Sequence, residues 1–137
     1  SARVYHSVAQ SIPSGAATAL NFDTESFDTD AIHDTVTNNT RLTCKTAAKY
    51  LIGVSVLWVA NSLGRRIVSI RLNGTTNIAD GRENSPGGQE PITDAQTIYD
   101  LAVNDYVEAV VYQDLGAALS TFVQSGNTPQ FWMVRVD

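Results

Sequence analysis

The longest apolar run of the chain covers residues 48–59, and it consists mainly of residues that favour strands. At a period of two, one face of this run carries Tyr50, Ile52, Val54, Val56 and Trp58. The other face carries Leu51, Leu57 and Val59, with Gly53 and Ser55 between them. A strand that is apolar on both faces does not suit the solvated edge of a sheet. We therefore expect a central strand that is covered twice, by a second sheet or by another subunit.

The rest of the sequence also reads as strands and turns. Apolar residues alternate in short runs, and Asn73-Gly74 is the strongest hairpin signal because both residues tolerate positive φ. Residues 23–40 are polar and acidic, which predicts a long, mostly irregular loop over the surface. In total the pattern predicts about eight to ten short strands and no helix. This is typical of an all-β antiparallel sandwich or barrel, here a single domain over residues 1–137.

Composition excludes several classes of function. The formal net charge is −5, so the chain lacks the basic stripe of a non-specific nucleic-acid binder or of a polybasic membrane anchor. Cys44 is the only cysteine, which excludes an intrachain disulfide and a multi-cysteine zinc site. The apolar run is shorter than the roughly 20 residues of a membrane-spanning helix, and no signal peptide is visible. We expect a soluble protein.

The sequence gives little support to catalysis or metal binding. His6 and His33 lie far apart, and neither belongs to a nucleophile motif. An enzyme on such a scaffold would need a metal, and two isolated histidines hardly supply a site for one. The acidic residues of the 23–40 segment lack the glycine and the bidentate glutamate of a calcium loop; they are Asp23, Glu25, Asp28, Asp30 and Asp34. We predict no enzymatic activity, no cofactor and no metal.

Residues 80–91 form the best candidate recognition surface. The segment is polar and rich in glycine and proline, which predicts an exposed loop, and loops on rigid sandwiches often bind partners. A plain connector is the alternative interpretation. The candidate contact residues are Asp80, Arg82, Glu83, Asn84, Gln89 and Glu90.

The order of certain residues resembles a known family, the C1q-like globular head, which is related to the tumour necrosis factor jelly roll. The residues that carry the resemblance span nearly the whole chain: Phe22, Asp34, Leu42, Ala48, Tyr50, Leu101, Asp105, Val107, Phe131 and Trp132. The sequence departs from the family at two positions, because Ala48 and Asn104 stand where the family usually has glycine. Asn tolerates a left-handed backbone, whereas Ala48 requires a negative φ.

The resemblance implies a jelly roll of about ten strands that assembles as a homotrimer and serves as a structural or binding head. The versions that it most resembles occur in bacteriophage virion proteins, so we expect a virion location, as a capsid decoration or a fibre head. The partners would be further copies of the chain and possible capsid, tail or host-receptor molecules. The alternative is a secreted or cell-surface module that recognises glycan or protein through its loops.

A trimer would also explain the second apolar face of the long strand. Aromatic residues are enriched at the centres of interfaces, so we predict subunit contacts at Tyr50, Trp58, Tyr112, Phe131 and Trp132. The alternative for each is an ordinary place in the core of one chain.

Overall fold

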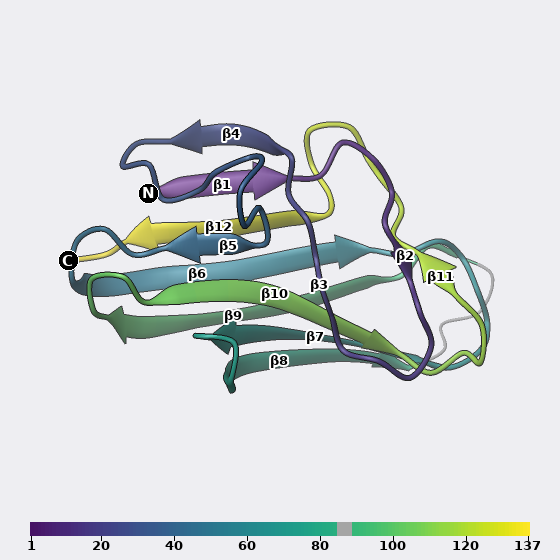
Figure 1. The fold of residues 1–137 in the computed structure, drawn as a ribbon. Helices are drawn as coiled ribbons and strands as arrows, with labels where there is room; N and C mark the ends of the chain where they lie inside the picture. The colour runs from purple at the N-terminus through teal and green to yellow at the C-terminus, as the bar shows by residue number, and fades with distance from the viewer. Residues whose placement is uncertain (85–88) are drawn as a thin grey trace.

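The computed structural model describes residues 1–84 and 89–137, which fold into two antiparallel sheets packed face to face (Figure 1). The first sheet contains, in spatial order, β4 (Thr24–Asp28), β1 (Ala2–Tyr5), β12 (Gln130–Arg135), β6 (Ala48–Leu57) and β9 (Ile92–Leu101). The second contains β3 (Thr18–Ala19), β10 (Tyr106–Gln113), β7 (Arg65–Leu72) and β8 (Thr76–Asn84), with β5 (Arg41–Thr43) also paired to β10. The predicted all-β antiparallel sandwich is confirmed.

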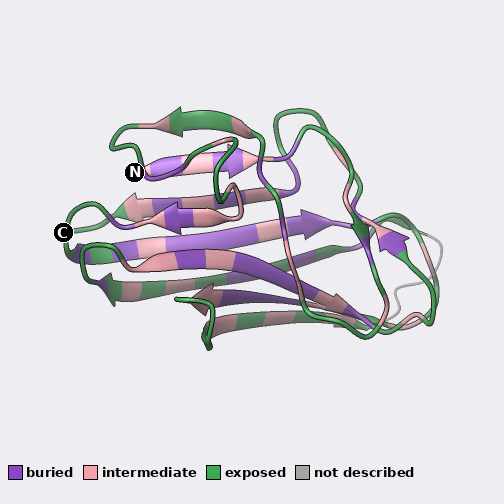
Figure 2. Ribbon diagram, viewed as in Figure 1, coloured by how far each residue is buried: buried purple, intermediate pink, exposed green. Residues whose placement is uncertain are grey.

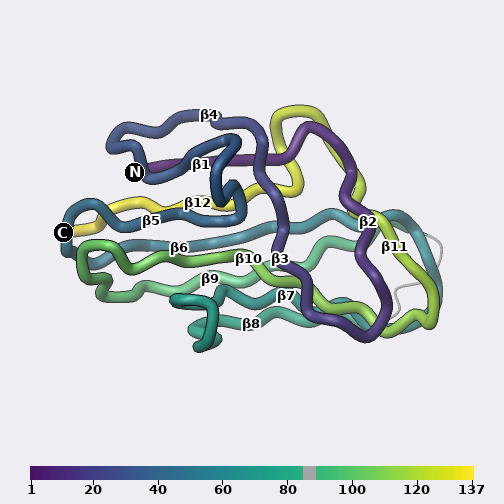
Figure 3. The backbone as a smooth tube through the Cα atoms, viewed as in Figure 1, coloured from purple at the N-terminus to yellow at the C-terminus, as the bar shows by residue number. Residues whose placement is uncertain are grey.

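A small third sheet closes one end of the sandwich. After β1 the chain runs to the end opposite the two termini, where β2 (Ser11–Ile12) pairs with β11 (Leu119–Ser120) (Figure 3). The side chains of Ile12 and Leu119 are buried there and belong to the main core. The core therefore extends from the space between the two large sheets to this closing pair.

The long apolar strand is central, as predicted. β6 pairs along its whole length with β9 and also pairs with β12. In Figure 2 it is mostly buried, whereas the edge strand β4 is mostly exposed. Its even-numbered side chains point between the sheets, where they meet β7 and β10 residues such as Val68, Ile70 and Val111. One face of the run is thus covered by the second sheet.

Two segments that the sequence predicts as loops contain strands instead. β4 lies inside the acidic 23–40 segment and is an edge strand paired only to β1. Because its side chains are polar and mostly exposed, its sequence shows no apolar alternation. β8 continues through residues 80–84, although glycine usually weakens a strand. Gly81 is suited to this place because a Cβ atom there would collide with the backbone carbonyl of Asp94 in β9.

Asparagines occupy the tight turns. Asn73 and Gly74 have φ values of 49° and 72°, which confirms the predicted hairpin between β7 and β8. The side chain of Asn73 also joins this hairpin to the start of β10, since it donates to Asp105 and accepts from the Tyr106 amide. Asn104 has a φ of 73°. It therefore adopts the left-handed backbone conformation at the position where C1q-like sequences usually have glycine. Ala48 lies in regular strand at the start of β6.

Two buried polar side chains hold neighbouring loops through the backbone. His6 Nδ1 lies 3.0 Å from the Asn21 carbonyl oxygen, and its Nε2 lies 2.9 Å from the Thr121 hydroxyl. Burial lowers the pKa of His6, even though the Asn21 contact and Asp23 act in the opposite direction. Arg66 is fully buried and donates to the carbonyls of Asn61, Leu63 and Gly64. These contacts pair most of the polar atoms that fold inward, although Arg66 Nε is buried without a hydrogen-bond partner among the described residues.

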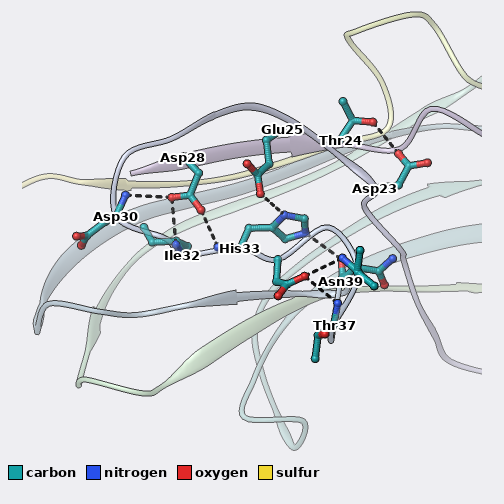
Figure 4. Close-up of polar contacts among 11 residues, drawn as sticks. Asp23, Thr24, Glu25, Asp28, Asp30, Ile32, His33, Thr37 and Asn39 are labelled. Carbon is teal, nitrogen blue, oxygen red and sulfur yellow. Dashed lines mark hydrogen bonds and ion pairs between the residues drawn. The ribbon is translucent and has the colours of Figure 1, made fainter.

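Asp28 and Glu25 hold the residues that follow β4 (Figure 4). Asp28 accepts hydrogen bonds from the amides of Asp30, Ile32 and His33, at distances between 2.9 and 3.1 Å. His33 lies between the Glu25 carboxylate at 3.0 Å and the Asn39 carbonyl at 3.2 Å. These bonds fasten residues 29–40, which we call the crossing segment, to β4. Asp28 thereby stabilises the turn that follows β4.

We expect Trp58→Ala to cost about 3–5 kcal/mol of unfolding free energy, because a large buried aromatic side chain is lost and a cavity remains. Trp58 is fully buried, and its indole N–H donates to the Thr93 hydroxyl at 2.9 Å. Urea unfolding followed by circular dichroism would measure the change. Val59→Ala, at the partly exposed next position, is the matched control, and an equal loss for both variants would contradict the assignment of Trp58 to the core.

We expect Asp28→Asn to destabilise the protein at neutral pH by about 1–3 kcal/mol, the usual cost of losing hydrogen bonds to a charged acceptor. Burial alone would raise the pKa of Asp28, but the three amides outweigh it and hold the pKa below its ordinary value. The carboxylate therefore stabilises the fold above the unfolded pKa of about 3.9, and this contribution is lost as the pH falls through the lower folded pKa.

Unfolding curves of the wild type and Asp28→Asn between pH 7 and pH 2 would therefore converge at the acidic end. Asp30→Asn is the control, because the exposed Asp30 side chain lies in the same segment. A difference between wild type and Asp28→Asn that is independent of pH would show that the ionised carboxylate is not what stabilises the crossing segment.

Candidate interaction surface

The face of the first sheet that points away from the second sheet is left uncovered by the described part of the chain. We call it the open face. Cross-strand register places its members opposite one another in rows, for example Arg3, Trp132, Gly53 and Gln96 along β1, β12, β6 and β9. The open face comprises Arg3, Tyr5, Phe27, Lys49, Leu51, Gly53, Ser55, Leu57, Ile92, Asp94, Gln96, Ile98, Asp100, Gln130, Trp132 and Val134.

An apolar row crosses β12, β6 and β9 on the open face. Val134, Leu51 and Ile98 lie opposite one another on β12, β6 and β9, and Trp132 lies two residues before Val134 on the same side of β12. We call these four residues the apolar stripe. The Ile98 side chain is 61% exposed, and the other three are half-buried. Phe27, at 43% exposure, adds a further apolar side chain on β4. Such a patch on a sheet face is typical of an interaction site.

Trp132 has a specific seat on this face. It lies opposite Gly53 in the register, and a Cβ atom on that glycine would collide with the indole ring. The ring therefore lies over the bare backbone of β6. Beside it is a groove of about 420 Å³, lined by Trp132, Gln96, Asp94 and Asp80, with Val54 and Ala95 also contributing.

Charges lie at the two sides of the open face. Arg3 is on β1, where its Nε donates to the Gln130 side chain at 2.8 Å. Asp94 is on β9 and is exposed. Lys49 and Asp100 lie opposite each other across β6 and β9. Within residues 1–84 and 89–137, neither Arg3 nor Asp94 forms an ion pair.

The aromatic residues predicted as subunit contacts lie in different places. Tyr50, Trp58 and Phe131 are at most 1% exposed and belong to the core of a single chain. Their positions in the period-two alternation point between the sheets rather than toward the open face. Tyr112 is on the outer side of β10 in the second sheet, where the Arg65 guanidinium lies 5.8 Å from its ring centre. Trp132 lies on the open face.

The predicted recognition loop is divided by the structure. Asp80, Arg82, Glu83 and Asn84 belong to β8, while Gln89 and Glu90 are exposed residues before β9. Residues 85–88 fall outside the described part of the chain. Asp80 accepts a hydrogen bond from the Ser69 hydroxyl at 2.5 Å and also lines the groove beside Trp132. The six residues therefore do not form one loop.

Sequence reasoning missed most of the open face. The signal for Leu51 was present, since it stands on the second face of the long apolar run. Ile98 and Val134 also fall in predicted strands, Ile98 between Thr97 and Tyr99 and Val134 on the same strand face as Trp132, but nothing in the sequence marks either as exposed. Arg3 and Asp94 belong to the same sheet face only because strand pairing joins β1 to β9 through β12 and β6.

The described residues offer little chemistry for catalysis. Both histidines are buried, and both nitrogens of each ring have a hydrogen-bond partner. Burial raises the pKa of the Cys44 thiol, which disfavours the reactive thiolate. In residues 1–84 and 89–137 no three metal-ligating side chains are grouped to hold an ion. No helix there is long and apolar enough to cross a membrane.

Comparison with known proteins finds likeness in structure rather than in sequence. No family model matches the chain, and a search of curated proteins finds no match. Among solved structures, the globular domain of zebrafish complement 1qA superimposes with a TM-score of 0.62 at 12% identity, covering 89% of this chain and 94% of that one. Murine APRIL gives a TM-score of 0.68 at 11% identity, covering 98% and 97%.

The Eiger TNF structure from S. frugiperda gives a TM-score of 0.69 at 10% identity, covering 99% of this chain and 91% of that one. The match thus extends over nearly all of each molecule. At these identities the likeness concerns the arrangement of strands. The chain has the C1q/TNF-like jelly-roll fold.

Proposed function

We propose that the chain is a non-enzymatic structural and binding module that assembles as a homotrimer through the open face. The observation that carries this proposal is the apolar stripe, which lies on a sheet whose opposite face already forms the core. Domains with this fold typically form homotrimers. Burying the stripe against further copies would contribute about 25 cal/mol for each Å² of apolar surface removed from water.

The composition of the open face suits a subunit contact. Its centre carries a tryptophan and aliphatic side chains, and its borders carry polar and charged residues. Specific interfaces commonly have this arrangement of an apolar, aromatic centre and a polar rim. Trp132 is also held flat by its seat on Gly53, so a contact there would need little ordering of the side chain.

Within this proposal the trimer serves in a bacteriophage particle, as a capsid decoration or a fibre head. The resemblance of the residue pattern to virion versions of the domain supports this location. Immunogold labelling of particles and host cells would test it, with labels expected on capsids or fibre tips. Labels confined to the cell surface would instead favour a secreted or surface module that binds glycan or protein.

Sedimentation velocity at micromolar concentration is the direct test of assembly. We expect one species with the mass of three chains. A species with the mass of one chain, unchanged up to the highest soluble concentration, would overturn the homotrimer.

We expect Ile98→Lys to weaken trimer formation by at least about tenfold, because a charge would be placed at the centre of the contact. The fold of one chain should be unaffected, since the Ile98 side chain is already 61% exposed. Val36→Lys is the matched control, because Val36 is exposed but lies in the crossing segment rather than on the open face. Equal dissociation constants for the two variants would show that the stripe is not the contact.

We expect Gly53→Ala to displace the Trp132 ring from its seat, with a loss of about 1–3 kcal/mol for the overpacked site. The displaced ring should be more accessible to acrylamide quenching, and the trimer should dissociate more readily. Measuring quenching in a Trp58→Phe background isolates the signal of Trp132. Ser55→Ala, a small change on the same side of β6, is the control. If acrylamide quenching of Trp132 were unchanged in Gly53→Ala, the packing of the Trp132 ring on Gly53 would be contradicted.

A further inference from the structure

We infer that the copies meet head to tail, with Arg3 on the β1 side of one open face paired with the acidic groove of the next copy. The groove side contributes Asp94 of β9 and Asp80 of β8. This inference rests on the proposed homotrimer and identifies which parts of the open face touch. It assigns to Arg3, Asp94 and Asp80 the role of selecting the orientation of the subunits.

The first ground is the separation of charge across the open face. Arg3 lies on β1, and Asp94 lies on β9, with β12 and β6 between them. Since adjacent strands are about 4.8 Å apart, the two backbones are separated by roughly 14 Å. Within the described residues the closest polar partner of the Arg3 guanidinium is the neutral Gln130 side chain. Among residues 1–84 and 89–137, Arg3 and Asp94 therefore have no ion-pair partner.

The second ground is the shape of the acidic side. The groove of about 420 Å³ opens beside the Trp132 ring, and Asp94, Asp80 and Gln96 are among its lining residues. A guanidinium group fits these partners, since it donates up to five hydrogen bonds and stacks on aromatic rings. The Oδ1 atom of Asp80 accepts a hydrogen bond from the Ser69 hydroxyl, which fixes the carboxylate at the border of β7 and β8.

The third ground is the geometry of a closed ring. In a cyclic trimer each contact joins two different parts of the subunit surface, so one side of each open face meets the other side of the next. Joining the β1 side to the β9 side brings Arg3 to Asp94 and Asp80. Joining two β9 sides would instead oppose Asp94 to Asp94, and like charges in contact cost several kcal/mol.

Charge reversal tests this pairing. Arg3→Glu and Asp94→Lys, made separately, should each weaken trimer formation by at least about tenfold, measured by sedimentation at 0.15 M salt. The double variant Arg3→Glu/Asp94→Lys restores opposite charges at positions 3 and 94 in exchanged places. It should bind more tightly than either single variant but less tightly than the wild type, because the unchanged Asp80 then faces an acidic residue at position 3. Arg71→Glu is the matched control, because Arg71 also donates its Nε to a side-chain amide, at 3.0 Å, but lies on the second sheet. It should leave the affinity unchanged.

The outcomes separate the two proposals. A wild-type chain that stays monomeric overturns the homotrimer and, with it, the pairing. A wild-type trimer whose single variants behave like Arg71→Glu, or whose double variant is no tighter than the single ones, overturns the pairing and leaves the homotrimer intact. Thermal unfolding of every variant, monitored by circular dichroism, checks that the fold persists, since both Arg3 and Asp94 lie at the surface.

Discussion

The structure depends on the pairing of β6 with strands on both sides. β6 pairs with β9 along its whole length and with β12 over six residue pairs, so its backbone is fixed at the centre of the first sheet. The position of the β6 backbone also determines which of its side chains point to each face of the sheet. The even-numbered side chains fill the sandwich, where Tyr50 and Trp58 are fully buried. The odd-numbered positions point outward, and Gly53 among them provides the flat place on which Trp132 rests.

Irregular segments are held to this frame by side chains that bind backbone atoms. Asp28 gathers three amides of the crossing segment, Arg66 binds three carbonyls of the loop before β7, and Asn73 connects the hairpin to β10. In each case one residue satisfies several backbone groups that would otherwise need water. The loops can therefore keep a fixed form without an apolar anchor in every segment.

The sequence predicts the sheets well where apolar alternation is strong and poorly where strand pairing alone determines the structure. The central strand, the Asn73-Gly74 hairpin and the sandwich follow from residue patterns. β4 and the far part of β8 do not, because polar edge strands have no apolar face to reveal them. The same limit affects the surface: large aromatics suggested an interface, but alternation within each strand sends Tyr50, Trp58 and Phe131 to the core. Leu51 and Ile98 become neighbours only through the register of β6 and β9.

The proposed contact divides affinity and specificity between two kinds of residue. The apolar stripe favours removal from water, but apolar contact is non-directional and gives little preference for one register of subunits over another. Charges at the sides of the face have the opposite properties: they add modest affinity, yet they penalise any arrangement that brings like charges together. Arg3 and Asp94 are separated by the width of the stripe. A subunit can therefore bury its stripe and pair both charges only when each neighbouring copy is joined head to tail. A cyclic trimer requires this type of contact, with a rotation between subunits that closes the ring.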